Sequence, residues 1–271
     1  MKWTNSALST LQGCGERFRR RYIEEDWRPS GPRAIRGTAV HRVARVGLLR
    51  KMTTHTLPSS EEARDLAADA FEMEWSRGVT LTREEIGAGD AVKADSKDFA
   101  VDLSAFHIEK VAPAINPVGV ERRITVQPQD SDLVIEGTID LIDRDPRGWE
   151  TIRDLKTTEK SPPAGTADKS DQLTMYAMIR MAEVGTLPAS LILDHLVRTP
   201  ERHDKKHVIQ ETERTPFDVA ALVERLNTAV EAVSKGVFVP ASADAWLCDP
   251  RYCEFFHDCP YTQGRARRLL T

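Results

Sequence analysis

Segments rich in β-branched and apolar residues predict a group of β-strands in the middle and later parts of the chain. Val134–Ile142 and Trp149–Thr157 are two such segments, and a Pro-Arg-Gly turn at 146–148 separates them. We therefore expect them to form adjacent strands or a hairpin. Three further strands are predicted, the last two as a hairpin, over residues 118–126, 190–198 and 206–211.

Apolar residues at helical spacing predict helices before, between and after these strands. The expected helices cover residues 4–26, 36–51, 59–77, 91–111, 169–184 and 215–236. The last begins with Thr215-Pro216-Phe217-Asp218, which offers a capping residue, a proline at the first position and an acid two further on. This order predicts an α/β or α+β fold with a mixed central sheet flanked by helices. Residues 1–271 are expected to form a single domain, with residues 55–112 as a helical insertion or cap.

Composition is that of a globular chain. Of the 271 residues 40% are hydrophobic and 30% charged, and no apolar run approaches the length of a transmembrane helix. The N-terminus lacks the apolar core of a signal peptide, so we expect a cytoplasmic protein without a membrane partner. The net charge of −4 does not favour nucleic acid, but phosphate contacts depend on local basic patches rather than on the sum.

Two carboxylates and a lysine fall on the two strands that are predicted to be adjacent. Side chains two apart in a strand share a face, so Asp154 and Lys156 point the same way and Leu155 points away. If Asp140 lies opposite them, the carboxylates can hold a hard divalent cation, and the lysine can stabilise charge on a phosphate under attack. The alternative is a hairpin with a solvated polar face, in which Asp and Lys simply pair.

Other candidate side chains lie on the helices. Gly37 and His41 are one helical turn apart, and so are Gln172 and Tyr176, so each pair shares a helix face. Glu121, on the strand 118–126, is a further residue that can face the site. A run of arginines, Arg17 and Arg19 to Arg21, with Tyr22 beside them, is either a solvated helix face or a phosphate-binding patch.

The four cysteines are distributed unevenly. Cys248, Cys253 and Cys259 lie close together, whereas Cys14 is near the other end of the chain. Four thiolates can hold a tetrahedral zinc ion or an iron–sulfur cluster, and three clustered cysteines with one remote suit a cluster at least as well. The alternative is four buried, unpaired cysteines. Either metal would join residues 1–30 to residues 240–265, which precede a basic tail with Arg265, Arg267 and Arg268.

Taken in order, these motifs resemble the RecB-like branch of the PD-(D/E)xK nuclease superfamily. The ordered set is Cys14, Gly37-x3-His41, Glu121, Gly137-x-x-Asp140, Asp154-x-Lys156, Gln172-x3-Tyr176 and the terminal cysteines, and it spans residues 14–260. The chain is most similar to members with an iron–sulfur cluster: CRISPR-associated nucleases, the AddB-type nuclease domain, and phage- or prophage-borne exonucleases. The resemblance implies a restriction-endonuclease-like core.

The resemblance also implies roles for the site residues. The implied ligands of Mg²⁺ or Mn²⁺ are His41, Asp140, Asp154 and the carbonyl of Leu155. Lys156 is the implied catalytic lysine, with Gln172 and Tyr176 beside it to orient the lysine or the DNA. The implied ligands of a 4Fe-4S cluster, with Zn²⁺ as the alternative, are Cys14, Cys248, Cys253 and Cys259. Here four residues separate the first two C-terminal cysteines, whereas the family commonly has two.

The resulting prediction is a metal-dependent DNA exonuclease that acts on single-stranded or frayed ends in repair, recombination or phage DNA processing. Recombination or replication proteins are the other partners considered. The residues expected to contact DNA are Arg17, Arg20, Arg21, Tyr22 and Arg36. Two other classes stay open: a non-catalytic iron–sulfur DNA-binding protein, and a zinc-stabilised adaptor subunit.

Overall fold

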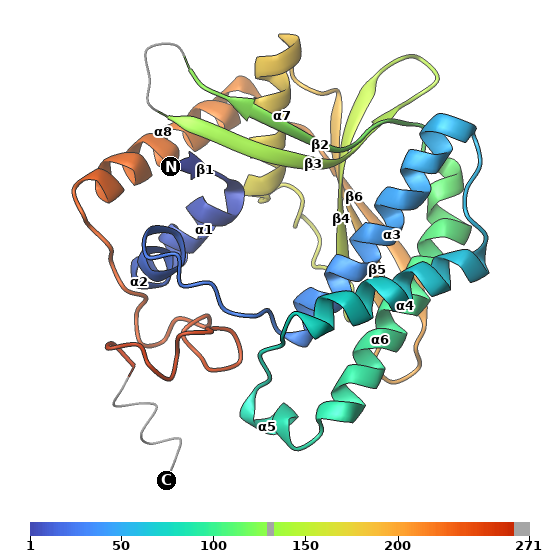
Figure 1. Ribbon diagram of the computed structural model, residues 1–271. Coiled ribbons are helices and arrows are strands. Elements are labelled where there is room, and N and C mark those ends of the chain that lie inside the picture. The colour runs from blue at the N-terminus through green and yellow to red at the C-terminus, as the bar shows by residue number, and fades with distance from the viewer. Residues whose placement is uncertain (129–132, 263–271) are drawn as a thin grey trace.

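The computed structural model describes residues 1–128 and 133–262, and within them six strands form one mixed sheet (Figure 1). The strands are β1 (Lys2–Trp3), β2 (Pro117–Val126), β3 (Val134–Arg144), β4 (Glu150–Thr158), β5 (Ser190–Arg198) and β6 (Lys205–Thr212). β3 is antiparallel to β2 and β4, whereas β5 is parallel to β4 and antiparallel to β6. The predicted hairpin over the last two strands is therefore confirmed.

Helices cover both faces of this sheet (Figure 1). One face carries α1 (Asn5–Gly13), α7 (Asp171–Val184) and α8 (Pro216–Ser234), and the other carries α3 (Pro32–Thr54), α4 (Ser60–Ser76) and α6 (Gly89–Phe106). The predicted fold class, a mixed sheet flanked by helices, is confirmed. Within the described part of the chain no helix has both the length and the apolar character needed to cross a membrane.

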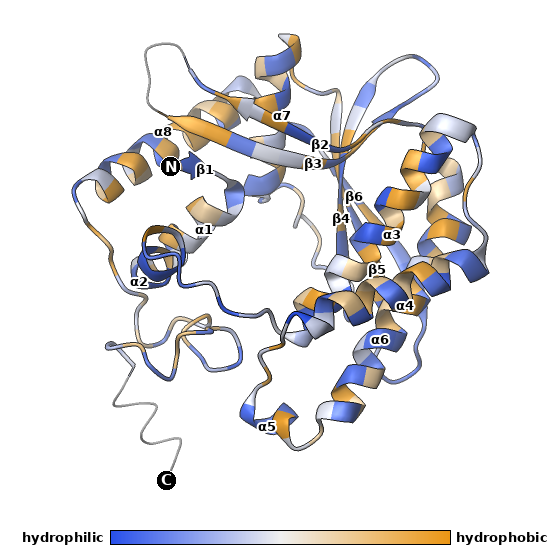
Figure 2. Cartoon of the chain, viewed as in Figure 1, coloured by the Kyte–Doolittle hydropathy of each residue, from blue (hydrophilic) through white to orange (hydrophobic). Residues whose placement is uncertain are grey.

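Two apolar cores follow from the alternation of side chains along the central strands. Ile152 and Leu193 face α7 and α8, and belong to one core. Leu155 and Leu196 face α3 and α6, and belong to the other. The helices of residues 55–112 bury small and aromatic side chains such as Phe99 in this second core, and Figure 2 shows apolar positions recurring among polar ones along α4 and α6. Asp154, next to Leu155, accordingly points to the α7 side of the sheet.

The predicted single helix over residues 4–26 is wrong, because the chain breaks at Cys14. Cys14 has an extended backbone (φ −162°, ψ 109°) between α1 and the short α2 (Gly15–Phe18), and a π-helical turn, Arg19–Ile23, follows. Gly15 packs so closely on the backbone of Phe238 and Val239 that a Cβ atom would lie 2.5 Å from the Val239 nitrogen. This contact needs glycine and turns the chain at the break.

Two short elements were not predicted. β1 has only two residues and pairs in parallel with the start of β3, and α5 (Arg83–Ile86) lies between the predicted helices 59–77 and 91–111. A two-residue strand has no periodicity to detect. The basic tail with Arg265, Arg267 and Arg268, and the end of the predicted region 240–265, lie outside the described residues.

Candidate active site

The site forms where β3 and β4 part. β2 occupies one edge of β3 along almost its whole length, while the other edge pairs with β1 at its start and with β4 only from Leu141 onward. The last β3–β4 pair is Leu141 with Arg153. Just past it, a carboxylate oxygen (Oδ2) of Asp140 accepts a 3.0 Å hydrogen bond from the backbone N–H of Leu155. The Asp140 side chain thus takes the place of a backbone hydrogen bond between the two strands, and an opening between β3 and β4 begins at this point.

Three side chains from three elements converge at this opening. His41 from α3, Glu121 from β2 and Asp140 from β3 bring one ligand atom each to within 4.8 Å of the others, and all three are half-buried. His41 Nδ1 lies 3.4 Å from Asp140 Oδ2. His41, which is brought in by a helix packed on the sheet, therefore reaches the carboxylates of the strands.

Glu121 has an unusual backbone at this point. The pairs on either side of it, Val120 with Leu141 and Arg122 with Ile139, place it opposite Asp140. Its φ angle is +48°, in the left-handed region that a residue with a side chain adopts at a cost of roughly 1–3 kcal/mol. Such backbone conformations concentrate at functional sites. From the sequence, the position of Glu121 on a neighbouring strand and its place in the ordered motif set marked it as a candidate.

Asp154 is the most enclosed of the carboxylates. Its side chain is 1% exposed and its Oδ2 atom lies 2.7 Å from Lys156 Nζ. Apart from this ion pair, neither of its carboxylate oxygens has a hydrogen-bond partner among the described residues. Buried carboxylates are normally paired on both oxygens, so Asp154 keeps acceptor capacity for a further ligand.

Lys156 is held by a short chain of polar groups on α7. Its Nζ atom donates to Gln172 Oε1 at 2.7 Å, and Gln172 Nε2 donates to the Tyr176 hydroxyl at 2.8 Å. Gln172 and Tyr176 lie one turn apart on the helix face that meets the sheet. The structure thus brings Lys156, Gln172 and Tyr176 together, with the lysine side chain 37% exposed at the opening.

Burial sets the protonation of these groups. Desolvation raises the pKa of Asp140 and that of Asp154, each to about 6, although the Leu155 N–H at Asp140 and the Lys156 ammonium at Asp154 act in the other direction. Burial also lowers the pKa of His41, which favours the neutral imidazole that binds metals. A divalent cation bound between the two carboxylates would offset the desolvation cost of ionising both of them.

These residues fit a hard divalent cation. Carboxylate oxygens and an imidazole are suitable ligands, and within the described part of the chain Asp154 has only the Lys156 ammonium as a partner. A small cavity of about 20 Å³ adjoins His41, Glu121 and Asp140. That volume holds about one water molecule.

Behind this cavity lies a buried ionic network that the sequence did not indicate. Asp194 accepts two hydrogen bonds from Arg153, at 2.7 and 2.9 Å, and lies 2.6 Å from His207 Nε2. His107, 2% exposed, lines the same cavity. The available signal was Asp194, a charged residue within the strand β5. All residues of β5 are buried, and charged residues are rarely buried without a partner.

The cysteines lie where the two ends of the chain meet. Cys14 Sγ accepts a hydrogen bond from the Ala241 N–H, and the Gly15 N–H donates to the Val239 carbonyl at 2.7 Å. Burial raises the pKa of Cys253 to about 11. Among the described residues no three cysteine sulfurs come within 4.8 Å of one another.

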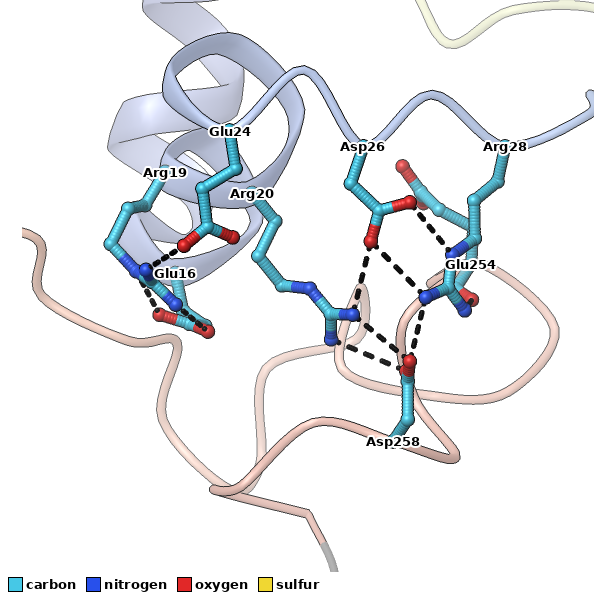
Figure 3. A network of polar contacts seen from close by, with 8 residues as sticks. All are labelled: Glu16, Arg19, Arg20, Glu24, Asp26, Arg28, Glu254 and Asp258. Carbon is cyan, nitrogen blue, oxygen red and sulfur yellow. Dashed lines mark hydrogen bonds and ion pairs between the residues drawn. The ribbon is translucent and has the colours of Figure 1, made fainter.

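Arginines of the N-terminal segment bind the acidic residues of the C-terminal loop (Figure 3). Asp258 lies between Arg20 and Arg28, at 2.9 and 2.6 Å, and both guanidinium groups also lie over the ring of Phe255. Glu254 pairs with Arg17 at 2.7 Å. We call this set of contacts between residues 16–28 and 254–258 the terminal clasp.

The arginines and the tyrosine that were predicted to contact DNA therefore have partners within the protein. Arg17 and Arg21 both face Glu254, and Tyr22 packs on Phe18. Arg36 is 6% exposed, pairs with Glu159 and lies 3.8 Å from the centre of the Phe99 ring. These contacts give the residues structural roles, and their contact with DNA stays a prediction.

In this site carboxylates, an imidazole and a lysine meet where two strands separate. Metal-dependent hydrolases of phosphate esters use sites of this kind. The profile of the PD-(D/E)XK nuclease superfamily matches residues 2–260, so the chain belongs to that superfamily.

Two solved structures are similar to this chain. One is named Putative exonuclease, from Eubacterium rectale: the identity is 10%, the TM-score 0.48, and the match covers 97% of this chain and 87% of that one. The other is SSO0001, at 16% identity and a TM-score of 0.35, with 95% of each chain covered. No curated protein matches the chain. The family assignment accordingly depends on the profile match.

Proposed function

We propose that the protein is a Mg²⁺- or Mn²⁺-dependent deoxyribonuclease that removes nucleotides from single-stranded or frayed DNA ends. The observation that carries this proposal is the convergence of His41, Glu121 and Asp140 on one point, next to the ion pair of Asp154 with Lys156. Repair, recombination and phage DNA processing are the processes in which such an activity serves, with recombination or replication proteins as partners.

The proposed ligands are His41, Glu121, Asp140 and Asp154, with the Leu155 carbonyl beside them. A divalent ion held by these residues would supply a polarised phosphate and a bound water of lowered pKa. Lys156 Nζ, fixed between Asp154 and Gln172, offsets negative charge on the phosphate as the water attacks. Tyr176 positions Gln172, and through it the lysine.

For the cysteines we propose a 4Fe-4S cluster that joins the two ends of the chain. The terminal clasp supports this, because it already brings the segment of Cys14 next to the loop of Cys253 and Cys259. Purified protein should be brown and absorb near ~400 nm. A colourless protein with stoichiometric zinc would favour the adaptor class.

End-labelled and circular DNAs, single- and double-stranded, test the activity in the presence of Mg²⁺ or Mn²⁺. We expect shortening of linear substrates and no cutting of circles. The Asp154→Ala variant should be inactive yet folded, as judged by circular dichroism. Cutting of circles would make the enzyme an endonuclease. If the wild type binds DNA without cleaving it, the protein is instead a non-catalytic DNA-binding protein.

A further inference from the structure

A groove runs from Lys156 along the N-terminal end of α7. It has a volume of about 560 Å³, enough for a nucleotide, and lies on the same side of the sheet as Asp154. None of the residues that line it is acidic, and the polar ones are Lys156, Thr157, Thr158, Thr166, Lys169, Ser170 and His195. Two ammonium groups and several hydroxyls without a carboxylate make the groove suited to an anion.

One wall of the groove is rigid. The loop that precedes α7 is fixed by Gln210, which donates to the Pro163 carbonyl at 2.7 Å and accepts from the Ala167 N–H at 3.1 Å. Arg214, 8% exposed, donates to the Ala167 carbonyl at 2.8 Å and to the Ser170 carbonyl at 3.1 Å. The start of α7 is thus held in place, and an anion in the groove would meet its positive end.

His195 is the unusual residue of the groove. It pairs with Lys156 in the parallel β4–β5 ladder, so the two side chains stand side by side, about 4.8 Å apart at their strands. His195 is 4% exposed, yet neither ring nitrogen has a hydrogen-bond partner in residues 1–128 and 133–262. Burying an imidazole without partners destabilises a fold, which suggests that the partner is a ligand.

We propose that this groove binds the phosphodiester next to the one that is cut, with His195 donating a hydrogen bond to it and Lys169 offsetting its charge. This inference deepens the proposed nuclease function and rests on it. The bound phosphate would fix the strand on the α7 side of Lys156. Asp171, in the first turn of α7, does not repel it strongly, because Arg225 holds the Asp171 carboxylate through two bonds of 2.6 and 2.7 Å.

The test uses single-stranded oligodeoxynucleotides that carry one neutral methylphosphonate, moved one linkage at a time past the cut bond. For the wild type, one linkage adjacent to the cut bond should lower kcat/KM about tenfold when neutralised, as expected for a lost hydrogen bond to a charged group. His195→Phe keeps the ring and removes both nitrogens. It should lower kcat/KM on the natural substrate about tenfold, largely lose the sensitivity to that linkage, and raise the Tm.

Lys169→Ala has a matched control in Lys160→Ala, because Lys160 is an exposed lysine nearby that does not line the groove. The full chain carries Asp154→Asn to prevent cleavage. In this background Lys169→Ala should remove about one phosphate contact, which changes the slope of the logarithm of the binding constant against the logarithm of the salt concentration by ~0.7. Lys160→Ala should leave that slope unchanged.

The proposal is overturned if His195→Phe raises the Tm but keeps both the activity and the methylphosphonate sensitivity, since the histidine then only packs. It is also overturned if neutralising the adjacent linkages leaves kcat/KM unchanged. The same holds if Lys169→Ala and Lys160→Ala change the salt dependence of DNA binding by the same amount. A wild type that cuts no natural oligonucleotide would refute the nuclease proposal instead, while the binding measurements would still report on the groove.

Discussion

The carboxylate of Asp140 takes the place of a sheet hydrogen bond to Leu155, at 3.0 Å, where β3 and β4 separate. We therefore propose two roles for Asp140: it binds the proposed cation, and it accepts the hydrogen bond of the Leu155 N–H where the strands separate. Asparagine keeps an oxygen for the Leu155 N–H, whereas alanine leaves that donor unpaired.

These roles can be separated by substitution. Asp140→Asn should lower kcat by about 10²–10³ or more, because the charge is lost at the metal, without lowering the Tm. Asp140→Ala should be as inactive and also less stable, by roughly 1–3 kcal/mol, through the unsatisfied N–H. Turnover of labelled DNA and thermal unfolding in EDTA measure the two effects. An Asp140→Asn variant within tenfold of wild-type activity would exclude Asp140 as a ligand.

Without metal, the protein should lose stability as the pH rises through weakly acidic values. Burial raises the pKa of Asp140 and of Asp154 from 3.8 to about 6, so the folded state holds protons that the unfolded state has released. The contribution of the protonated Asp140 and Asp154 to the free energy of unfolding is complete below pH 3.8, and it is lost as the pH rises through about 6. Unfolding in EDTA across this window measures the loss, and Asp154→Asn should flatten the curve.

Mg²⁺ should reverse this trend, because its ligands must be deprotonated. The rise in Tm on adding Mg²⁺ should be larger at pH 8 than at pH 5. An equal rise at both pH values would show that these carboxylates do not bind the ion.

The chain from Lys156 through Gln172 to Tyr176 predicts a graded loss of activity. Lys156→Ala should have the largest effect, and Gln172→Ala a smaller one, because the lysine keeps its ion pair with Asp154. Tyr176→Phe removes only the hydroxyl that accepts from Gln172 and should cost about tenfold or less. Because these residues position Lys156, kcat should fall while KM stays constant. If KM rises instead, the residues bind the strand directly.

The sequence predicted the parts of this site that depend on local periodicity. Asp154 and Lys156 share a strand face, and Gln172 and Tyr176 share a helix face, because spacing along one element decides both. Whether His41 meets Asp140 depends on how α3 packs against β3, and no local pattern contains that information. The family resemblance implied the contact, and the distance of 3.4 Å shows it.

Features that arise from irregular backbone could not be predicted in this way. The break at Cys14 depends on the contact of Gly15 with Val239, more than 200 residues away in the chain. Glu121 has a left-handed φ angle inside the strand β2, where strand propensity predicts an extended backbone. From the sequence, the arginine run at residues 17–21 is either a solvated helix face or a phosphate-binding patch, and only the fold shows that acidic residues of the C-terminal loop face it.

Glu121→Gly should make the protein more stable and less active. Glycine adopts a φ angle of +48° without steric strain, so the variant should gain about 1 kcal/mol, while the carboxylate near His41 and Asp140 is lost. Glu121→Ala removes the same carboxylate and keeps the backbone strain, so it serves as the matched control. Both variants should need more Mg²⁺ for half-maximal activity. Unchanged Mg²⁺ dependence would remove Glu121 from the set of ligands.

Loss of the terminal clasp should loosen the cysteine region before it affects the rest of the fold. Arg20 and Arg28 hold the pKa of Asp258 at about 2, so its contribution to stability is present above pH 3.8 and is lost as the pH falls toward 2. Asp258 is 46% exposed, so Asp258→Asn should cost about 1 kcal/mol or less in global stability.

The local effect of Asp258→Asn should be larger than the global one. We expect faster proteolysis within residues 237–262 and faster release of iron or zinc to a chelator, since Cys253 and Cys259 flank the clasp. Glu231→Gln, which removes an exposed ion pair with Lys235 on α8, is the matched control and should change neither rate. If the two variants release metal at the same rate, the clasp does not hold the cysteine loop in place.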